Sequence, residues 1–249
     1  MTGKVFLVGA GPVNPDLITV GGLRHLQTAD VVIYDKLIAH SLLDEAPEGA
    51  ELIDASKTRH ADTLTQDQIN ELLVDRAKQG FKVVRLKGGD PYTFGRGSEE
   101  ALYCLEHNVE VEVIPGVSAL AAATAAAGIP LTHRFASAGF MVSLGYVKPE
   151  YSYLINRESQ AKFNGTMVFF MTQLADLETI LREMLELGYD PETAAAVIHK
   201  GGTPDQEVLV DKASTLAEKV RERWGDMPIP SIAVLGAALN LRDNLPRIS

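Results

Sequence analysis

The first half of the chain alternates short apolar runs with longer amphipathic stretches. The runs have the length of β-strands and are rich in valine, isoleucine and leucine, as strands are when helices cover both faces of a sheet. Because parallel strands are joined by crossovers, usually helices, this order predicts a parallel α/β sheet. The apolar runs are KVFLVGA (4–10), VVIYD (31–35), FKVVRLKGG (81–89) and VEVEVIPG (109–116), and the stretches between them are 14–29, 65–80 and 95–108.

Two of these stretches begin with helix-capping residues. Asn14 can cap with Pro15 in the first turn, and Thr65 with Gln68 three residues later forms a capping box. Both positions therefore predict helix starts.

The pattern changes after Pro115 and Gly116, where strands become more frequent relative to helices. This change predicts two α/β domains, 1–115 and 116–249, with an antiparallel strand pair in the second. About twenty residues from 145 to 165 read as a polar loop, a length typical of lids and binding loops. The second half is expected to contain a small-residue helix after 116, strands at 140–145, 166–172, 194–202, 207–210 and 231–237, a helix over 173–187 and another after 210.

Neither the N-terminus nor any internal run has the features of a membrane or export segment. The first residues lead straight into VFLVGAG, without the long apolar stretch of a signal peptide. The most apolar segment, SALAAATAAAG (118–128), is too short and too rich in alanine to cross a bilayer. We therefore expect a cytoplasmic protein with no membrane partner.

Charge and cysteine content exclude several other classes. The net charge of −10 at pH 7 argues against a nucleic-acid partner, because phosphate binding relies on clustered lysine and arginine. An anionic substrate would need a local basic cluster acting against this overall field. Cys104 is the single cysteine, so no intramolecular disulfide or cysteine cluster for zinc can form, and no metal site is predicted.

The glycine-rich turn GAGPVN (9–14) resembles a dinucleotide-binding fingerprint without completing it. Gly9 and Gly11 fit the first two glycines, but Asn14 stands at the third position and Pro12 occupies the turn. The spacing therefore disfavours a nicotinamide or flavin enzyme. Asp35 ends the next strand. A carboxylate at this position either points into a ligand crevice or serves only to cap the end of the strand.

The stretch KGGDPYTFGRGSEEA (87–101) combines a tight turn with isolated charges. Glycines after a buried strand let a ligand approach the backbone or let the chain turn, and Asp90 with Pro91 sets a rigid turn. Glu99 and Glu100 suit the first turn of a helix. Arg96 lies between two glycines that cannot bury its stem, which favours a binding role.

Seven blocks follow one another in an order that resembles the uroporphyrinogen-III C-methyltransferase family, within the larger group of tetrapyrrole methylases. They are VGAGPVNPDLIT (8–19), DVVIYDKL (30–37), TQDQIN (65–70), VVRLKGGDPYTFGRGSEE (83–100), VIPGVSA (113–119), AGIPLTHR (127–134) and GTPDQ (202–206). The likeness is close to residue 134 and looser beyond it. It implies a homodimer of two α/β domains with S-adenosylmethionine in the cleft between them. The implied reaction methylates C2 and C7 of uroporphyrinogen III, giving precorrin-2 for sirohaem or cobalamin-type cofactors and S-adenosylhomocysteine.

The resemblance also implies roles for particular residues. A sulfonium nucleoside suits backbone groups and small residues at close range, whereas a substrate with eight carboxylates suits arginines. Ser118 and Ala119 could instead start a close-packed helix, and Met171 could fill the core. The implied cofactor residues are Pro12, Gly88, Gly89, Asp90, Thr93, Ser118, Ala119, Met171 and Gly201.

Catalytic and substrate roles follow from the same resemblance. Asp35 matches the family's proton acceptor and Lys57 its proton donor, since methylating a ring carbon requires a proton to leave or move. Arg96, Glu99 and Arg134 are the expected substrate residues, the arginines for carboxylates and Glu99 for pyrrole N–H groups. His133 is expected to be structural.

Several positions depart from the family pattern, mostly on the substrate side. Two alternatives therefore stay open: a methyltransferase for another tetrapyrrole, and a cofactor-binding protein without turnover. The departures are Val13, Gly21, Gly22, Thr58, Asp62, Phe135 and Tyr146.

Overall fold

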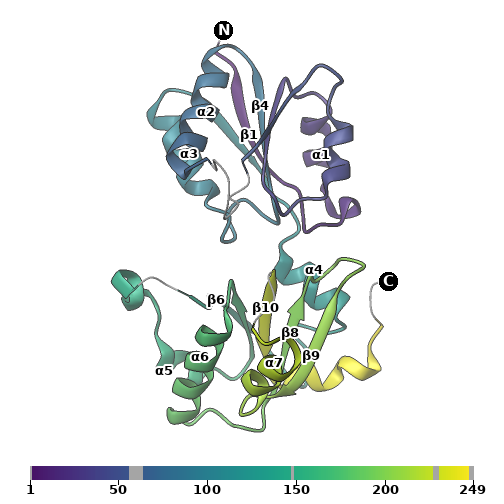
Figure 1. The fold of residues 1–249 in the computed structure, drawn as a ribbon, viewed down its shortest axis with the longest axis vertical. Coiled ribbons are helices and arrows are strands. Elements are labelled where there is room, and N and C mark those ends of the chain that lie inside the picture. Colours follow the sequence, from purple (N-terminus) through teal and green to yellow (C-terminus); the bar gives the residue numbers. More distant parts are fainter. Residues whose placement is uncertain (1, 56–63, 147–148, 227–229, 247–249) are drawn as a thin grey trace. The chain divides into compact units, whose positions relative to one another are not determined.

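The chain forms two compact units, Met1–Ala119 and Leu120–Ser249 (Figure 1). A computed structural model describes residues 2–55, 64–146, 149–226 and 230–246. Each unit contains a five-stranded sheet with helices packed on it. The predicted fold class of two α/β domains is confirmed.

The first unit is a parallel sheet in the order β3-β2-β4-β1-β5. Helices α2 and α3 cover one face and α1 the other (Figure 1). The strands are β1 (Lys4–Gly9), β2 (Val31–Tyr34), β3 (Glu51–Asp54), β4 (Lys82–Lys87) and β5 (Glu110–Ile114); the helices are α1 (Val20–Leu26), α2 (Gln66–Lys78) and α3 (Gly97–Glu106), with 3-10 helices η1 (Pro15–Leu17) and η2 (His40–Glu45).

Alternate residues of the central strands enter two separate cores. In β1, Val5 and Leu7 pack in the core under α2 and α3, whereas Phe6 and Val8 pack in the core with Leu26 of α1. This alternation follows from the two-residue period of a strand, and it explains the continuous apolar runs of the sequence.

Helix caps decide where the helices of this unit begin. The capping box of Thr65 and Gln68 at the start of α2 is confirmed. The predicted single helical stretch 14–29 is wrong: Asn14 caps only η1, and the chain becomes extended before Thr19 caps α1 through the Gly22 N–H. The sequence pattern also missed β3, whose four residues lie mostly exposed at the sheet edge and lack an apolar run.

The second unit has a mixed sheet in the order β6-β7-β10-β8-β9, which confirms the expected antiparallel pairing. Leu177 and Ile180 of α6 pack with Val220 of α7 in the core of this unit. The strands are β6 (Phe140–Leu144), β7 (Thr166–Phe170), β8 (Ala194–His199), β9 (Glu207–Lys212) and β10 (Ser231–Leu235); the helices are α4 (Ala119–Ala126), α5 (Arg157–Ala161), α6 (Leu174–Glu186) and α7 (Leu216–Trp224), with 3-10 helices η3 (Pro149–Leu154) and η4 (Ala237–Asn244).

The predicted loop 145–165 contains regular structure. It includes η3 and the short helix α5, which begins where the Asn156 side chain accepts the Ser159 N–H. This Asn cap is a sequence signal that the polarity of the stretch obscured.

Strand direction in the second sheet defines two edges. Because β10 is antiparallel to both β7 and β8, and β6 is parallel to β7, the strands β6, β7 and β8 all end at the same edge. We call this the carboxyl edge and the opposite one the amino edge.

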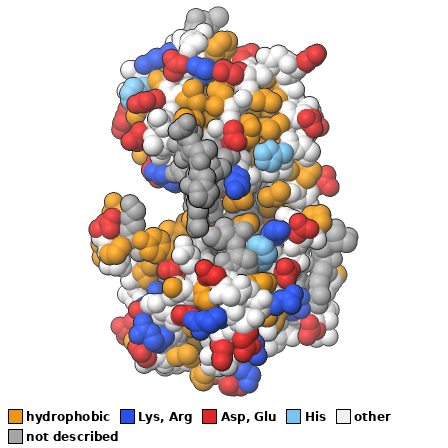
Figure 2. Space-filling view, viewed as in Figure 1, with side chains coloured by type: hydrophobic (Ala, Val, Ile, Leu, Met, Phe, Trp, Pro, Cys, Tyr) orange, Lys and Arg blue, Asp and Glu red, His pale blue; other side chains and the backbone are white. Residues whose placement is uncertain are grey.

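Acidic and basic side chains are interspersed over the surface drawn in Figure 2. Within the described ranges, no helix combines the length and apolar character needed to cross a membrane.

Candidate functional site

Main chain from three strands meets at the carboxyl ends of the first sheet. Gly11 and Gly89 exchange two backbone hydrogen bonds, with N···O distances of 3.1 and 2.7 Å. A Cβ on Gly116 would lie 2.3 Å from the Gly89 carbonyl oxygen and 2.6 Å from the Gly9 Cα. Only a chain without side chains can pack this closely, so this edge presents backbone groups. Pro12 is buried directly after this bridge.

Different constraints require glycine at the two positions of the KGGDP turn. A Cβ on Gly88 would lie 2.5 Å from the Leu37 carbonyl oxygen, so Gly88 is required for packing against the loop after β2. Gly89 has a φ of +71°, and a Cβ there would have no atom nearer than 3.9 Å, the Ala119 nitrogen. The space beside Gly89 is therefore open, and a ligand can approach its main chain. Ser118 and Ala119, two other predicted cofactor residues, border this space.

Asp90 organises the turn through both carboxylate oxygens. Its Oδ1 accepts the Tyr92 N–H and the Thr93 hydroxyl, each at 3.0 Å, and its Oδ2 accepts the Gly116 N–H at 3.2 Å. Asp90 thus ties the end of β4 to the end of β5 and fixes Thr93. Any contribution of this turn to a ligand would come largely from its main chain.

Asp35 lies at the end of β2, beside this turn. One carboxylate oxygen accepts from the Arg85 guanidinium, and the other lies 3.4 Å from the Gly88 nitrogen. The side chain remains about one-third exposed. Asp35 is therefore oriented from two directions and still accessible, as a general base must be.

Behind Asp35, a cluster of charged side chains is buried between β4 and α3. Glu100 Oε1 accepts from Lys87 Nζ at 2.9 Å, from Arg85 Nε at 3.2 Å and from Gln66 Nε2 at 3.2 Å. Arg85, Lys87 and Glu100 are all almost completely buried. Glu100 Oε2 is also buried and has no hydrogen-bond partner in the described part of the chain. We call Arg85, Lys87 and Glu100 the buried charge cluster.

Burial and charge act in opposite directions within this cluster. Burial lowers the pKa of Lys87, and the neighbouring Arg85 lowers it further. Burial also opposes the charge of Arg85, but Asp35 and Glu100 outweigh it, so the pKa of the Arg85 guanidinium is raised. The carboxylates of Asp35 and Glu100 therefore keep the Arg85 guanidinium charged, and this positive charge lies directly behind Asp35.

The buried charge cluster was not predicted from the sequence, although β4 carries a signal for it. Arg85 and Lys87 stand two residues apart in the run VVRLKGG, so they share one face of a buried strand. Charges there require buried counter-charges. The partner, Glu100, was interpreted only as a favourable residue for a helix start.

Arg96 and Glu99, predicted to bind substrate, pair with each other. Arg96 Nε and a terminal nitrogen donate to the two Glu99 oxygens at 2.9 and 2.6 Å, which raises the pKa of Arg96. Arg96 has a left-handed φ of 58°, and Phe94, two residues before it, has a φ of 57°. Such strain in non-glycine residues concentrates at functional sites. The pair is exposed, so an anionic ligand can compete for the guanidinium.

In the second unit, Met171 and Gly201 lie at the carboxyl edge, after β7 and β8. Met171 is exposed with a left-handed φ of 52°, so it does not fill the core. Lys200, next to Gly201, has a φ of 47°. A Cβ on Gly201 would lie 2.2 Å from the Ala123 Cβ, so Gly201 lets α4 pack closely. The carboxyl edge thus carries the two predicted residues, Met171 and Gly201, and two non-glycine residues with positive φ, Met171 and Lys200.

Arg134 lies near the amino edge of that sheet instead. Its turn is closed by hydrogen bonds between His133 and Ser137, and the Ser137 hydroxyl lies 3.0 Å from that of Thr166, the first residue of β7. Five residues of β7 separate this edge from Met171, roughly 13–17 Å. Within its unit, Arg134 is therefore not brought together with Met171 and Gly201. It lines a shallow depression of about 230 Å³ with Phe135 and Asn164.

Lys57, the predicted proton donor, lies outside the described residues, as do Thr58 and Asp62. Among the residues that are described, no group of three or more His, Cys, Asp or Glu side chains is placed to hold a metal ion.

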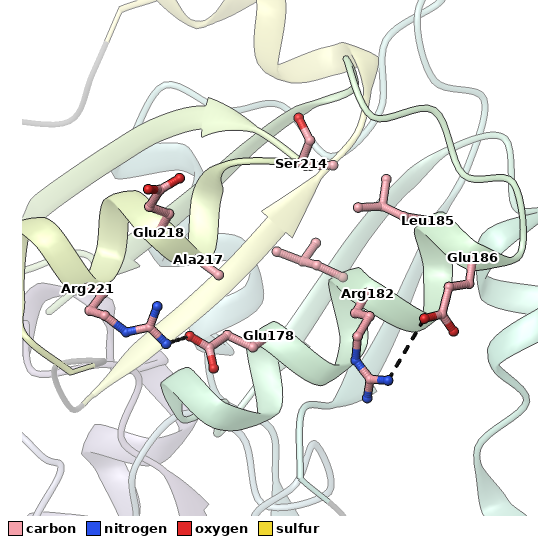
Figure 3. A pocket seen from close by; sticks show the side chains of 10 residues that line it. Glu178, Arg182, Leu185, Glu186, Ser214, Ala217, Glu218 and Arg221 are labelled. Atoms are coloured by element: carbon pink, nitrogen blue, oxygen red, sulfur yellow. Dashed lines mark hydrogen bonds and ion pairs between the residues drawn. The ribbon is translucent and has the colours of Figure 1, made fainter.

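Another depression, of about 390 Å³, lies between α6 and α7 and contains none of the predicted site residues (Figure 3). Its walls carry opposite charges that pair locally: Arg221 with Glu178, and Arg182 with Glu186 at 3.9 Å. Glu218 also lines the depression, so its walls carry no excess of positive charge that would select an anionic ligand.

Comparison with known proteins identifies the family. The family model for tetrapyrrole (corrin/porphyrin) methylases matches residues 4–217. The chain belongs to the tetrapyrrole methylase family. This confirms the resemblance that the seven ordered blocks predicted.

Individual tetrapyrrole methylases are similar over nearly the whole chain. A uroporphyrinogen-III C-methyltransferase of Methanocaldococcus jannaschii is 40% identical over 248 residues, covering 98% of this chain and 100% of that protein. A siroheme synthase of Hahella chejuensis is 42% identical over 244 residues, and the chain spans only 51% of its length. A crystal structure of uroporphyrin-III C-methyl transferase from Thermus thermophilus, complexed with S-adenyl homocysteine, has a TM-score of 0.78 at 34% identity, covering 96% of this chain and 100% of that one.

Proposed function

We propose that this tetrapyrrole methylase uses S-adenosylmethionine to methylate uroporphyrinogen III at C2 and C7, producing precorrin-2 and S-adenosylhomocysteine. The observation that carries the proposal is the KGGDP turn: an open main-chain surface at Gly89, with the Asp35 carboxylate held beside Gly88. Relatives of matching length with the name of this activity support it.

The cofactor, when bound, supplies an electrophilic methyl group on a sulfonium. Pro12, Gly88, Gly89 and Asp90 would hold it through main-chain groups, because that edge exposes backbone at close range. Thr93, Ser118 and Ala119 would complete the contacts of the first unit, and Met171 and Gly201 those of the second. Much of the acceleration would come from holding the methyl group in line with the ring carbon.

Asp35 would accept the proton that the macrocycle loses elsewhere once a ring carbon has been methylated. Arg85 and the Gly88 N–H fix its carboxylate, so its remaining lone pairs face a defined direction. Lys57 would donate a proton elsewhere on the macrocycle. Because Arg85 is buried, it acts on the substrate only through Asp35.

Arg96 would bind a substrate carboxylate by exchanging its present partner. The exposed pairing with Glu99 is weak in water, whereas a propionate or acetate offers the same two-oxygen geometry. Glu99, once released, would accept a pyrrole N–H. Arg134 would bind a carboxylate at the periphery of the substrate. Its position near the amino edge gives this role no direct support.

The test is anaerobic incubation of the purified protein with uroporphyrinogen III and S-adenosylmethionine, followed by mass analysis. We expect a product that has gained two methyl groups and lost two protons, and two equivalents of S-adenosylhomocysteine. A protein that binds S-adenosylhomocysteine but transfers no methyl group to this substrate would overturn the proposal.

A second candidate is methylation of a different tetrapyrrole. Phe135 favours it, because this side chain is 88% exposed where the family usually has glycine. Incubation with a panel of tetrapyrroles distinguishes the candidates by which one gains methyl groups. Methyl transfer to any of them would also exclude a cofactor-binding protein without turnover.

The proposed enzyme would work as a cytoplasmic homodimer, feeding sirohaem or cobalamin-type pathways. The relatives named siroheme synthase support the first of these uses. Sedimentation of the purified chain measures the oligomeric state.

A further inference from the structure

Large apolar side chains are exposed on three loops at the carboxyl ends of the first sheet. Val13 follows β1, Leu37 follows β2 and Tyr92 follows β4, and these three strands are neighbours in the sheet. The three residues are 39%, 46% and 60% exposed. Single exposed apolar residues are common, but several gathered at one end of a sheet mark a binding surface. Val13 directly follows Pro12, a proposed cofactor residue, so the other two are the candidates for substrate contact.

Leu37 lies beside the KGGDP turn and the proposed base. A Cβ added to Gly88 would lie 3.3 Å from the Leu37 Cβ, so the leucine side chain begins next to this turn. The Gly88 nitrogen also lies 3.4 Å from a carboxylate oxygen of Asp35. Leu37 therefore offers an apolar contact close to the carboxylate that would act on the substrate.

The loop that carries Tyr92 is folded tightly on itself. The Gly97 N–H donates to the Pro91 carbonyl oxygen at 2.9 Å, and a Cβ on Gly97 would lie only 2.5 Å from that oxygen. A Cβ on Gly95 would lie 2.8 Å from the carbonyl oxygens of Asp90 and Pro91. Together with the bond from the Tyr92 N–H to Asp90, these contacts fix the main chain from which the tyrosine ring extends. The ring can therefore bind a ligand without first ordering the loop.

Tyr92 contributes little to the packing of its own unit. Among the described residues, no aromatic ring or cationic group packs on its ring. A tyrosine side chain has only two rotatable angles, so it loses little entropy when it binds. An aromatic face held ready in this way suits a ligand that is itself a flat ring.

Arg96 belongs to the same loop and lies between the two glycines that approach Pro91. Tyr92 follows Pro91 directly, so the tyrosine and arginine side chains leave the main chain from neighbouring points. A pyrrole ring that carries an acetate or propionate presents a flat face and a carboxylate close together. Tyrosine and arginine in this arrangement suit those two groups, the first by stacking and the second by two parallel hydrogen bonds.

We propose that Tyr92 and Leu37 form an apolar subsite for the pyrrole rings of the substrate. Tyr92 stacks on the ring whose carboxylate Arg96 binds, and Leu37 contacts the part of the macrocycle that Asp35 faces. The inference rests on the function proposed above. It adds the uncharged part of substrate recognition, which the arginines do not supply.

Steady-state kinetics with uroporphyrinogen III tests the tyrosine. Tyr92→Ala should raise the KM for this substrate about tenfold, as loss of an aromatic platform under a stacked ring does, while kcat changes less. Tyr92→Phe should restore the wild-type KM, because it keeps the ring. Leu102→Ala on α3 is the matched control with an unchanged KM, since Leu102 is also 60% exposed. A KM for Tyr92→Ala no higher than that of the control would overturn the stacking.

Leu37→Ala should raise the same KM about threefold or more, because it removes apolar contact area but keeps the Cβ beside Gly88. Leu52→Ala on β3 is its matched control, because the two leucines are 46% and 47% exposed. Calorimetry should give the wild-type affinity for S-adenosylhomocysteine in every alanine variant, and thermal unfolding verifies that each variant folds. Loss of this affinity in Leu37→Ala or Tyr92→Ala would assign the surface to the cofactor and overturn the subsite.

A double-mutant cycle tests whether Tyr92 and Arg96 hold the same ring. The dissociation constant of uroporphyrin III, the fluorescent oxidised form of the substrate, is measured for Tyr92→Ala, Arg96→Ala and the double variant. Two groups that hold one ring lose their effect together, so the double variant should bind more tightly than the product of the two single losses predicts. Losses that simply multiply would overturn the shared ring.

Failure of the proposed function would give a different pattern. Binding of uroporphyrin III requires no methyl transfer, so it tests the subsite in a protein without turnover as well. A wild-type chain that binds this porphyrin through Tyr92 but makes no dimethylated product would overturn the proposed reaction and retain the subsite. A wild-type chain that makes this product with a KM that neither Tyr92→Ala nor Leu37→Ala raises would overturn the subsite and retain the reaction.

Discussion

Asp35 takes its orientation from groups that belong to a different strand. Arg85 and the Gly88 N–H both come from β4 and its turn, whereas Asp35 follows β2. Two hydrogen bonds leave the carboxylate little rotational freedom. A base held this way can act without first being ordered by substrate.

Asp35→Asn should lower kcat about 10²- to 10⁴-fold, the usual contribution of a positioned general base. S-adenosylhomocysteine affinity, measured by calorimetry, should change little, because the predicted cofactor contacts lie on Gly89 and its neighbours. Asp54→Asn, at the last residue of the adjacent strand β3, is the control and should keep full turnover. Equal loss of binding and turnover in Asp35→Asn would indicate a cofactor ligand instead of a base.

Burial of Cys104 predicts how the free energy of unfolding changes at alkaline pH. Burial raises the pKa of its thiol from 9.0 to about 11. The unfolded chain therefore loses this proton near pH 9 and the folded chain only near pH 11. Between these values the folded state binds more protons, so Cys104 lowers the free energy of unfolding as pH rises from 9 to 11.

Two measurements check this behaviour. Native protein at pH 8 should react very slowly with a thiol-specific disulfide reagent, and protein unfolded in urea should react at once. Replacing Cys104 with Ala should reduce the decline in unfolding free energy between pH 9 and 11. Rapid modification of the native thiol at pH 8 would contradict the burial on which both expectations depend.

At the scale of elements, the buried charge cluster joins β4 to α3. Glu100 contacts both Arg85 and Lys87, and it lies fully inside the first unit. Breaking a buried pair from one side leaves uncompensated charge, which costs more than the pair contributes. The position of α3 and the orientation of Asp35 thus depend on one side chain.

Glu100→Gln should lower the free energy of unfolding by about 3 kcal/mol or more, because two buried cations lose their shared counter-charge. Urea unfolding measures the change. Glu99→Gln is the matched control on the same helix, and loss of its exposed pair should cost at most about 1 kcal/mol. Similar stabilities for the two variants would show that the cluster does not hold β4 and α3 together.

Elements with strong local signals could be predicted, and those fixed by distant partners could not. The apolar runs of β1 and β4 and the Thr65 capping box sufficed for their elements. The short strand β3 is held at its edge by pairing with β2, which local sequence does not encode. The split of the stretch 14–29 depended on Thr19, a capping residue inside an apparently continuous pattern.

The candidate site shows the same division. The KGGDP turn was predictable, because its glycine and aspartate chemistry is local. The pairing of Arg85 with Glu100 links two elements, and the position of Arg134 near the amino edge depends on the direction of β7. Sequence spacing contains neither of these facts.

At the scale of the whole molecule, the predicted cofactor residues are divided between the two units. Gly89 and its neighbours belong to the first sheet, and Met171 and Gly201 to the carboxyl edge of the second. Each unit has its own core, so each can in principle open by itself. A ligand that contacts both would stabilise both, by an amount set by its concentration relative to its dissociation constant.

Hydrogen exchange with and without S-adenosylhomocysteine tests this division directly. We expect slower exchange in two separate segments, 88–95 in the first unit and 171–174 with 200–203 in the second. The segment 133–137, near the amino edge, is the internal control and should be unaffected. Protection limited to the first unit would remove Met171 and Gly201 from the site. Protection of neither unit at saturating ligand would contradict the proposed cofactor, because binding to main chain at these turns must slow their opening.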